Sequence, residues 1–377
     1  MSAFFIGLMS GTSLDGVDGV IADLSHDAPN LVRAAASEPF EADFKAELLA
    51  LNSPGHNELH RAALAANQLA GVYARVVELL LQIATPQNIQ RQNITAIGAH
   101  GQTVRHQPQV FGTGYTLQLN NPSLLAELTG IDVIADFRNA DVAAGGQGAP
   151  LVPAFHAALW ADAAQSRAVL NIGGISNISL LPAGGTVQGF DCGPGNALLD
   201  FWCMRHTGRP FDDGGAWAAS GQAQPALLDR LRQAPYFQQT PPKSTGRDLF
   251  NPDWLATQLT GFESVPAVDV QASLTALTAL TCAQDLRQHL PSAAQLLVCG
   301  GGALNTELMR QLAQALPGVQ VLSTQARGLP PLQVEAAAFA WLAQAFVLKQ
   351  PGNLVAVTGA KGPRVLGALH RAPPFLP

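Results

Sequence analysis

The feature that most constrains the fold is a pattern that occurs twice: an apolar strand, a turn of small residues, and a second apolar strand. The first copy runs from Ala3–Met9 through Ser10-Gly11 to Gly19–Leu24. The second lies within Ala168–Leu181, where AVLN, IGGIS and NISLL follow one another. Each copy predicts a β-hairpin. Their repetition predicts an internal duplication, with two α/β domains of similar core.

Other periodicities fit this two-domain plan. Apolar residues at helical spacing predict a long helix over Leu59–Ile83 with Asn57 as its N-cap, and an apolar helix over Gln333–Val347. A helix over Asn196–His206 and a buried strand over Leu296–Val298 are also expected. The chain has 377 residues, enough for two cores. We place the first domain at 1–130, with the tail 362–377 packing on it, and the second at 131–361.

Composition excludes several classes of protein. Hydrophobic residues make up 47% and charged residues 13%, which excludes a disordered chain. The net charge of -6 argues against a nucleic-acid binder, which usually has a basic surplus. The N-terminus has no basic stretch before its apolar run, and we expect neither a signal peptide nor a membrane partner. The four cysteines form no CxxC pair and are expected to be buried thiols: Cys192, Cys203, Cys282 and Cys299.

The first hairpin turn, within GLMSGTSLDGVD, has the residue types of a phosphate site. Backbone N–H groups in a turn of small residues can approach phosphate oxygens, and hydroxyl groups add donors. No GKS or GKT follows, so the turn is not a P-loop. An ordinary tight hairpin is the alternative. The candidate residues are Gly11, Thr12, Ser13, Leu14, Asp15, Gly16, Val17 and Asp18.

Three glycine-rich turns of the second half offer related chemistry. Gly173 and Gly174 form the second hairpin turn, although a purely structural turn is as good a reading. Asp191 precedes a turn that opens a helix, where a carboxylate can serve as a general base, a magnesium ligand or a helix cap. Three glycines after the Leu296–Val298 strand leave room for a base or ribose. The candidate residues of the last two turns are Gly193, Gly195, Asn196, Gly300, Gly301, Gly302 and Asn305.

Three further polar residues stand at the ends of apolar segments. His100 ends a strand, and Arg138 follows one, from where it can bind a substrate carboxylate in bidentate fashion. Glu335 is the only charge in the first turns of an apolar helix. There it either complements the helix dipole or contacts sugar hydroxyl groups.

Together these segments resemble the anhydro-N-acetylmuramic acid kinase family over nearly the whole chain, from Gly7 to about Ala360. The resemblance rests on GTSLDGVD, ADFR, AAGGQGAPLVPAFH, FDCGPGN, KSTGRDLFN and VEAAAFAWLA in this order. It implies the two-domain fold of actin, hexokinase and Hsp70, which is ribonuclease H-like, with ATP in the interdomain cleft. It also implies a cytoplasmic enzyme and a homodimer.

The resemblance implies a hydrolytic kinase reaction as well. Water opens the 1,6-anhydro ring while the 6-oxygen takes the γ-phosphate, which gives N-acetylmuramate 6-phosphate and ADP. Asp191 matches the family's general base, and Glu335 would hold the sugar or assist at the same centre. Many kinases of the wider fold carry an aspartate where this chain has Met9, so the candidate ligands for Mg²⁺ are Asp15, Asp18 and Asp191. The loop Thr324–Gly328 also departs from expectation, with Gln325 and Arg327 where an acidic residue is expected.

Three alternatives remain open at this point. The first is a kinase for another sugar, and the second is a nucleotide-dependent sugar-sensing module of the same fold. A sensor has no need of a base, so Asp191 and Glu335 together argue against the second. The third is a metal-dependent hydrolase, for which HNELH at His56–His60 is the only HxxxH match and lacks the glutamate of HExxH.

Overall fold

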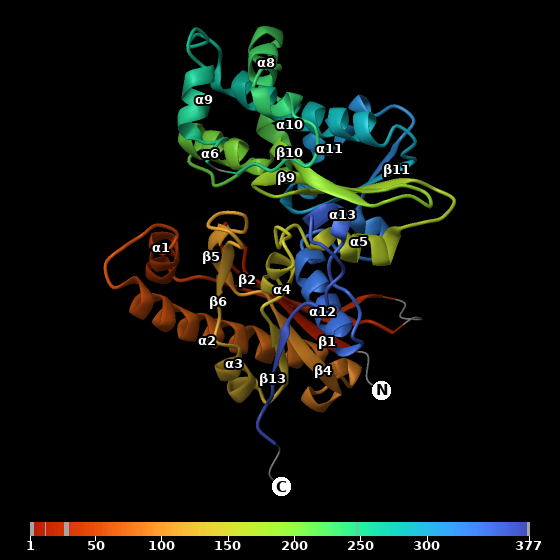
Figure 1. Ribbon diagram of the computed structural model, residues 1–377. Helices are drawn as coiled ribbons and strands as arrows, with labels where there is room; N and C mark the ends of the chain where they lie inside the picture. The colour runs from red at the N-terminus through yellow and green to blue at the C-terminus, as the bar shows by residue number, and fades with distance from the viewer. Residues whose placement is uncertain (1–3, 12, 26–29, 247, 375–377) are drawn as a thin grey trace. The chain divides into compact units, whose positions relative to one another are not determined.

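The computed structural model describes residues 4–11, 13–25, 30–246 and 248–374, which form two compact units (Figure 1). The first unit consists of the described residues within 1–155 and 333–377, and the second is His156–Leu332. Each unit is built on its own β-sheet.

The sheet of the first unit has the strand order β13-β7-β4-β1-β2-β3. Strands β1, β2 and β3 are successive antiparallel neighbours, β4 runs parallel to β1, and β7 runs parallel to β4. β13 adds an antiparallel edge to β7. The strands are β1 (Phe4–Met9), β2 (Gly16–Asp23), β3 (Val32–Pro39), β4 (Ile94–Ala99), β7 (Val133–Ala135) and β13 (Ala368–His370).

The sheet of the second unit has the order β10-β9-β8-β11-β12. Strands β8, β9 and β10 are antiparallel neighbours, whereas β11 runs parallel to β8 and β12 to β11. The strands are β8 (Arg167–Ile172), β9 (Ile175–Leu181), β10 (Gln188–Pro194), β11 (Gln295–Cys299) and β12 (Gln320–Ser323).

The two sheets share one topology, which confirms the duplication predicted from the hairpins. In both, the first three strands in chain order are antiparallel and the next two extend the sheet in parallel beside the first strand. This order is that of the ribonuclease H-like fold. The chain therefore has the two-domain α/β architecture of the actin, hexokinase and Hsp70 class.

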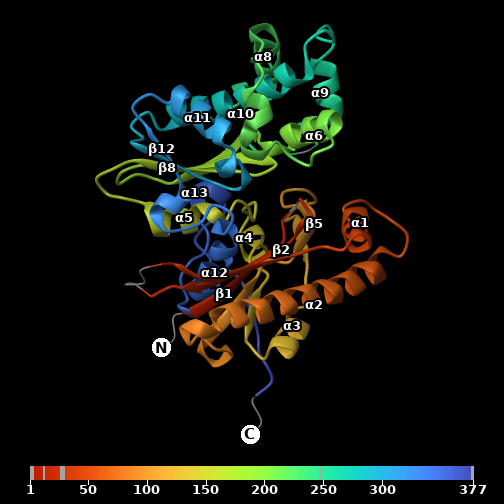
Figure 2. The same cartoon turned by 180° about the vertical axis from the view of Figure 1, so that it is seen from behind.

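Helices cover both faces of the first sheet (Figures 1 and 2). Helix α2 (Glu58–Ala84) packs its apolar side on one face, in a core that includes Leu8, Leu69 and Val76. It is long and apolar enough to cross a membrane by length and composition, but half of that apolar window is buried in the protein. We therefore regard α2 as a core helix. Asn57 is its N-cap, as predicted, although the side chain makes no capping hydrogen bond.

Helix α12 (Val334–Val347) covers the other face at very short range. A Cβ atom added to Gly7 on β1 would lie 1.8 Å from the Ala336 carbonyl oxygen. One added to Gly98 on β4 would lie 2.0 Å from the Phe339 carbonyl oxygen. Only glycine allows the helix backbone to come this close to the two strands.

In the second unit, α10 (Ala267–His289) and α11 (Thr306–Ala315) pack on one face of the sheet. A second apolar cluster joins α10 to α6 (Asn196–Thr207) and neighbouring short helices. The other α-helices and β-strands described are α1 (Ala42–Ala50), β5 (Gln102–Gln107), β6 (Tyr115–Leu119), α3 (Pro122–Thr129), α4 (Asn139–Ala143), α5 (Val152–Trp160), α7 (Ala216–Ala219), α8 (Pro225–Arg232), α9 (Pro252–Gln258) and α13 (Val355–Thr358).

The unit boundaries differ from the predicted 130/131 and 361/362. Strand β7 is hydrogen-bonded to β4, and α12 packs on β1 and β4, so both belong to the first unit rather than the second. The tail, with β13, joins the first unit too.

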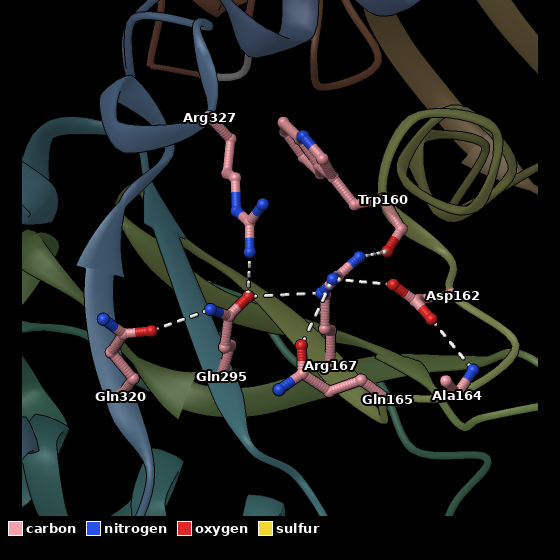
Figure 3. A network of polar contacts seen from close by, with 8 residues as sticks. All are labelled: Trp160, Asp162, Ala164, Gln165, Arg167, Gln295, Gln320 and Arg327. Atoms are coloured by element: carbon pink, nitrogen blue, oxygen red, sulfur yellow. Dashed lines mark hydrogen bonds and ion pairs between the residues drawn. The ribbon is translucent and has the colours of Figure 1, made fainter.

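A polar network fixes the sheet of the second unit around Arg167 (Figure 3). The Arg167 guanidinium donates to Asp162 Oδ2 at 2.8 Å, the Trp160 carbonyl at 3.0 Å and Gln295 Oε1 at 3.2 Å. Arg327 donates to the same Gln295 oxygen from the other side. The arginine in the Thr324–Gly328 loop therefore has a structural partner on β11.

Replacing Arg167 by methionine is expected to lower the free energy of unfolding by about 2–3 kcal/mol, since it removes a charged donor from several partners. Its side chain is 13% exposed, so water replaces these hydrogen bonds poorly. Arg310→Met is the matched control. The Arg310 side chain is 52% exposed in its ion pair with Glu307, so this change should lower the free energy of unfolding by less than about 1 kcal/mol. Urea unfolding measures both, and equal effects would contradict the account.

Candidate functional site

The first hairpin turn divides into buried and accessible residues. Leu14 and Val17 are 4% and 1% exposed and their side chains belong to the core, so any contact of these two residues with a phosphate would be made by the backbone N–H groups. A Cβ on Gly16 would lie 2.3 Å from the Glu38 carbonyl oxygen, so packing against β3 explains this glycine. Ser13, Asp15 and Asp18 are exposed and Gly11 is partly so, which makes them the solvent-accessible residues of the turn among those described. Thr12 lies outside the described residues.

A buried hydrogen-bond network holds the start of this turn. The Ser10 hydroxyl lies 3.0 Å from the Tyr73 hydroxyl and donates to the Gly101 carbonyl at 3.1 Å. The Gly101 N–H donates to the Tyr73 hydroxyl at 3.0 Å. Burial raises the pKa of Tyr73 to about 12, so the phenol stays neutral and available for both contacts. The turn is thereby tied to helix α2 and to the end of β4.

His100 is held neutral beside Arg138. Arg138 donates to His100 Nε2 from Nε at 3.2 Å and from Nη2 at 2.8 Å. Because Nε2 must accept, the ring proton lies on Nδ1, which donates to the Ser10 carbonyl at 3.3 Å. Burial and the Arg138 charge lower the pKa of His100 to about 3. Both ring nitrogens are engaged, so we expect any part of His100 in sugar binding to be indirect, through Arg138.

Arg138 keeps donors for a ligand. Its Nη1 donates to the Gly148 carbonyl at 2.7 Å, which leaves one N–H on Nη1 and one on Nη2 without a partner among the described residues. A guanidinium group with two unused N–H donors can bind a carboxylate in bidentate fashion. Burial lowers the pKa of Arg138 to about 10, so it remains charged at neutral pH.

Glu335 and Asp18, both in the first unit, influence each other electrostatically. Burial raises the pKa of Glu335, the Asp18 carboxylate raises it further, and Arg138 lowers it. Asp18 Oδ1 accepts from the Ser37 hydroxyl at 2.6 Å, and Asp15 forms an exposed ion pair with Lys45 at 3.0 Å. Of the predicted magnesium ligands in this unit, Asp15 is already paired with a cationic side chain, whereas the printed partner of Asp18 is a neutral hydroxyl group.

No group of three or more His, Cys, Asp or Glu side chains converges as a metal site within the described part of the chain. The HNELH segment in particular is not one. His56 precedes the first residue of α2, so it shares no helical face with His60. The described cysteines form no disulfide and are all buried, as predicted.

Two buried histidines are expected to make stability fall with acid. Burial lowers the pKa of both His100 and His156 to about 3, whereas unfolded histidines titrate near pH 6.5. The unfolded chain therefore binds more protons below pH 6.5, and unfolding should become easier by about 1.4 kcal/mol per pH unit per histidine. The raised pKa values of Glu335 and Asp191 partly offset this. Urea unfolding at several pH values measures how the free energy of unfolding changes with pH. The variant His156→Gln should reduce this slope. A free energy of unfolding that does not change between about pH 6.5 and pH 4 would contradict the prediction.

The second hairpin turn folds under the N-terminus of α6. The carbonyl of Gly173 accepts the Asn196 N–H at 2.7 Å, and that of Gly174 accepts the N–H groups of Gly195 and Ala197 at 3.0 and 3.2 Å. These first N–H groups of α6 are thus satisfied within the protein. Phosphate contacts in this region would fall to the N–H groups of the turn itself.

The three glycines after β11 have distinct roles. A Cβ on Gly300 would lie 2.5 Å from Asn171 Oδ1, and one on Gly302 would lie 2.5 Å from the Ile172 side chain, so close packing explains both. Gly301 instead lines a pocket of about 390 Å³ together with Asn196 and Asn305. Asn305 also caps α11 through its side-chain oxygen, which accepts the Leu308 N–H at 3.0 Å.

This pocket brings together three of the predicted nucleotide residues with others that the sequence did not reveal. Its apolar walls include Phe211, Leu304 and Leu332, which are all largely exposed. Its polar lining includes Asp200 and Asp213. Apolar walls with a few polar groups suit a flat base and a ribose.

Asp191 lies at a β-bulge and is held from one side. The pairing of β10 with β9 shifts between Asp191 and Gly193, and a Cβ on Gly193 would lie 2.6 Å from the Phe237 ring. Asp191 Oδ2 accepts the Ser244 hydroxyl at 2.9 Å and the Thr245 N–H at 3.0 Å. No described residue hydrogen-bonds to Oδ1. Burial raises the pKa of Asp191, while Thr245, Ser244 and Lys243 lower it. A carboxylate with one oxygen fixed in this way and the other without a partner among the described residues suits a general base.

The residues that hold Asp191 were missed by sequence reasoning. Ser244 and Thr245 belong to KSTGRDLFN, a segment that the sequence connects to the family resemblance only. No periodicity or spacing within that segment indicates that it contacts Asp191.

Comparison with known proteins agrees with the resemblance. A family model described as anhydro-N-acetylmuramic acid kinase matches residues 3–372. An anhydro-N-acetylmuramic acid kinase from Variovorax paradoxus (strain S110) is 62% identical over 375 residues, which cover 98% of this chain and 99% of the relative. One from Albidiferax ferrireducens (strain ATCC BAA-621 / DSM 15236 / T118) is 58% identical over 393 residues, with 99% and 100% covered. Among solved structures, the activator of the 2-hydroxyisocaproyl-CoA dehydratase from Clostridium difficile with bound ADPNP aligns with 92% of this chain and 96% of its own, at 13% identity and a TM-score of 0.48.

Proposed function

Because the chain belongs to the anhydro-N-acetylmuramic acid kinase family, we propose that it is a sugar kinase that hydrolytically opens 1,6-anhydro-N-acetylmuramic acid and phosphorylates it. The net reaction converts the sugar, ATP and water to N-acetylmuramate 6-phosphate and ADP, a step of peptidoglycan recycling. Water adds to the anomeric carbon, the bond from that carbon to the 6-oxygen breaks, and the 6-oxygen takes the γ-phosphoryl group.

Asp191 is the proposed general base, and its geometry is the observation that carries the assignment. Oδ2 is fixed by Ser244 and Thr245, so Oδ1 can take the proton of the attacking water in a defined position. Glu335, which lies in the first unit, is proposed to contact the sugar.

ATP is the proposed phosphoryl donor. We assign its base and ribose to the pocket of the second unit lined by Asn196, Gly301 and Asn305. Its phosphates are assigned to the accessible residues of the first turn and to the N–H groups of Gly173 and Gly174. Preorganised N–H donors stabilise the charge of a phosphoryl group in transfer.

Mg²⁺ is the proposed cation, with Asp18 as its first ligand and Asp191 as the alternative. Magnesium in kinases usually binds one or two carboxylates together with substrate phosphates, and Asp18 is an exposed carboxylate that forms no ion pair with a described side chain. When bound, the cation neutralises charge on the phosphate oxygens. We further propose that the enzyme is cytoplasmic and acts as a homodimer.

Arg138→Lys is expected to raise KM for the sugar by roughly 10–100-fold with a smaller change in kcat, because a lysine cannot form the bidentate contact with the lactyl carboxylate. His100 supports this fork at 2.8 Å, so the effect should depend on the carboxylate of the ligand. An analogue without that carboxylate provides the comparison. Equal losses for the acid and for the analogue would refute the contact.

The function itself is tested with purified protein, ATP, Mg²⁺ and 1,6-anhydro-N-acetylmuramic acid. We expect ADP release that depends on the sugar and a product heavier than the sugar by water plus a phosphoryl group. A product without the added water would indicate a different kinase reaction. Sugar binding without ADP release would indicate a sensing module instead.

A further inference from the structure

Behind Asp191 lies a buried ion pair that the proposed reaction does not use. Lys243 Nζ donates to Asp285 Oδ1 at 2.9 Å and to Oδ2 at 3.1 Å. The two side chains are 1% and 5% exposed. Such a pair contributes little net stability, because removing both charges from water costs about as much as their attraction returns. Its presence beside the proposed base therefore invites a functional explanation.

The pair is connected to Asp191 along three routes. Lys243 directly precedes Ser244 and Thr245, which hold Asp191 Oδ2, and its own carbonyl accepts the Asp191 N–H at 3.2 Å. The Asp285 carboxylate also interacts electrostatically with the thiol of Cys192, the residue after Asp191, whose pKa is raised by burial and further by this carboxylate.

Aromatic rings confine the ammonium group further. Lys243 Nζ lies 5.6 Å from the ring centroid of Phe190, the residue before Asp191, and 5.2 Å from that of Tyr236. The Tyr236 hydroxyl in turn donates to the Asp191 carbonyl at 2.7 Å. Ring faces attract cations, so these contacts help to fix Lys243 in one position.

We propose that the Lys243–Asp285 pair positions the base: it anchors the segment 243–245 to helix α10 and thereby holds the Ser244–Thr245 clamp on Asp191. Lys243 and Asp285 are positioning residues, since neither has to touch the substrate. This inference rests on the proposed function, in which Asp191 takes a proton from water. A loosened clamp should lower kcat, because small displacements of a reacting group have large kinetic costs, whereas KM should not change.

The test is a mutant cycle between the pair and its clamp. The pair is removed with Lys243→Met and Asp285→Leu together, which leaves no unpaired buried charge. We expect this double variant to melt near the wild-type Tm and to lose at least about tenfold in kcat with KM unchanged. Ser244→Ala alone should also lower kcat, but adding it to the double variant should cause little further loss, because the clamp is already displaced. Arg167→Met is the control, a change in the same unit that lowers Tm and leaves kcat as it is.

Wild-type kcat in the double variant would overturn the proposal, and so would a triple variant whose loss is the product of the separate losses. If the double variant gives no cooperative melting curve, Lys243→Met combined with Asp285→Asn replaces it in the same cycle with the same expectations, since this combination also leaves no buried charge unpaired. Asp191→Asn is run alongside. If that variant keeps wild-type kcat, the assignment of the base fails as well. If it is inactive while the double variant is fully active, only the positioning role fails.

Discussion

Replacing Asp191 by asparagine is expected to lower kcat for sugar-dependent ADP release by roughly 10²–10⁴-fold. An amide oxygen can still accept from the Ser244 hydroxyl and the Thr245 N–H, so the segment around residue 191 should keep its shape. What asparagine cannot do is take up the proton of the attacking water. Affinity for ATP, measured by calorimetric titration, should stay the same.

The matched control for this variant is Asp162→Asn, which makes the same chemical change in the same unit. Asp162 binds Arg167 at 2.8 Å in the polar network of Figure 3 and has no contact with Asp191. It should affect stability rather than kcat. Normal turnover by the Asp191 variant would remove this residue from the mechanism and leave the family's fold in place.

Replacing Gly7 by alanine should destabilise the protein by about 3 kcal/mol or more. The added methyl group would lie 1.8 Å from the Ala336 carbonyl oxygen and 2.7 Å from the Ala340 nitrogen. Both are backbone atoms, so no side-chain rotation can make room. The clash can be relieved only by moving α12 away from β1. Because Glu335 precedes Ala336, activity should fall together with stability.

Gly71→Ala is the control for this substitution. Gly71 lies within α2, and an added Cβ would meet only the end of the Arg75 side chain at 3.8 Å. Alanine should therefore stabilise the protein by roughly 0.5–1 kcal/mol, since glycine is a poor helix former. Urea unfolding of both variants measures the contrast. A Gly7→Ala protein as stable as the wild type would contradict the packing described for α12.

Local patterns were sufficient to predict the hairpin at the centre of each domain. The hairpins at Ser10-Gly11 and at Gly173-Gly174 have both strands and turn within a short segment, so sequence periodicity alone describes them. Sequence periodicity could not predict the domain boundaries. Strand β7 and helix α12 lie far apart in the chain, and only their packing on the first sheet assigns them to the same unit.

For the site, the sequence showed which residues carry chemistry better than it showed how they are used. Asp191, Arg138 and Glu335 stand out as polar groups at the ends of apolar segments. Leu14 and His100 stand equally close to glycine turns, yet the first packs into the core and the second has both ring nitrogens bonded. Such partners come from distant segments, as Lys243 and Asp285 do for Asp191, and a pattern within one segment cannot reveal them.

The first unit is formed by two segments that are separated in the chain by the second unit, and this affects how the protein folds during synthesis. Its sheet is built mainly from the N-terminal third of the chain, but the helix that covers one face begins only at Val334. During translation, this apolar face emerges from the ribosome long before its cover is synthesised. The second unit, by contrast, is continuous and can fold as soon as Leu332 has emerged. The nascent chain therefore completes its second half before its first, and it carries an uncovered apolar surface in the meantime, the kind of surface that chaperones bind.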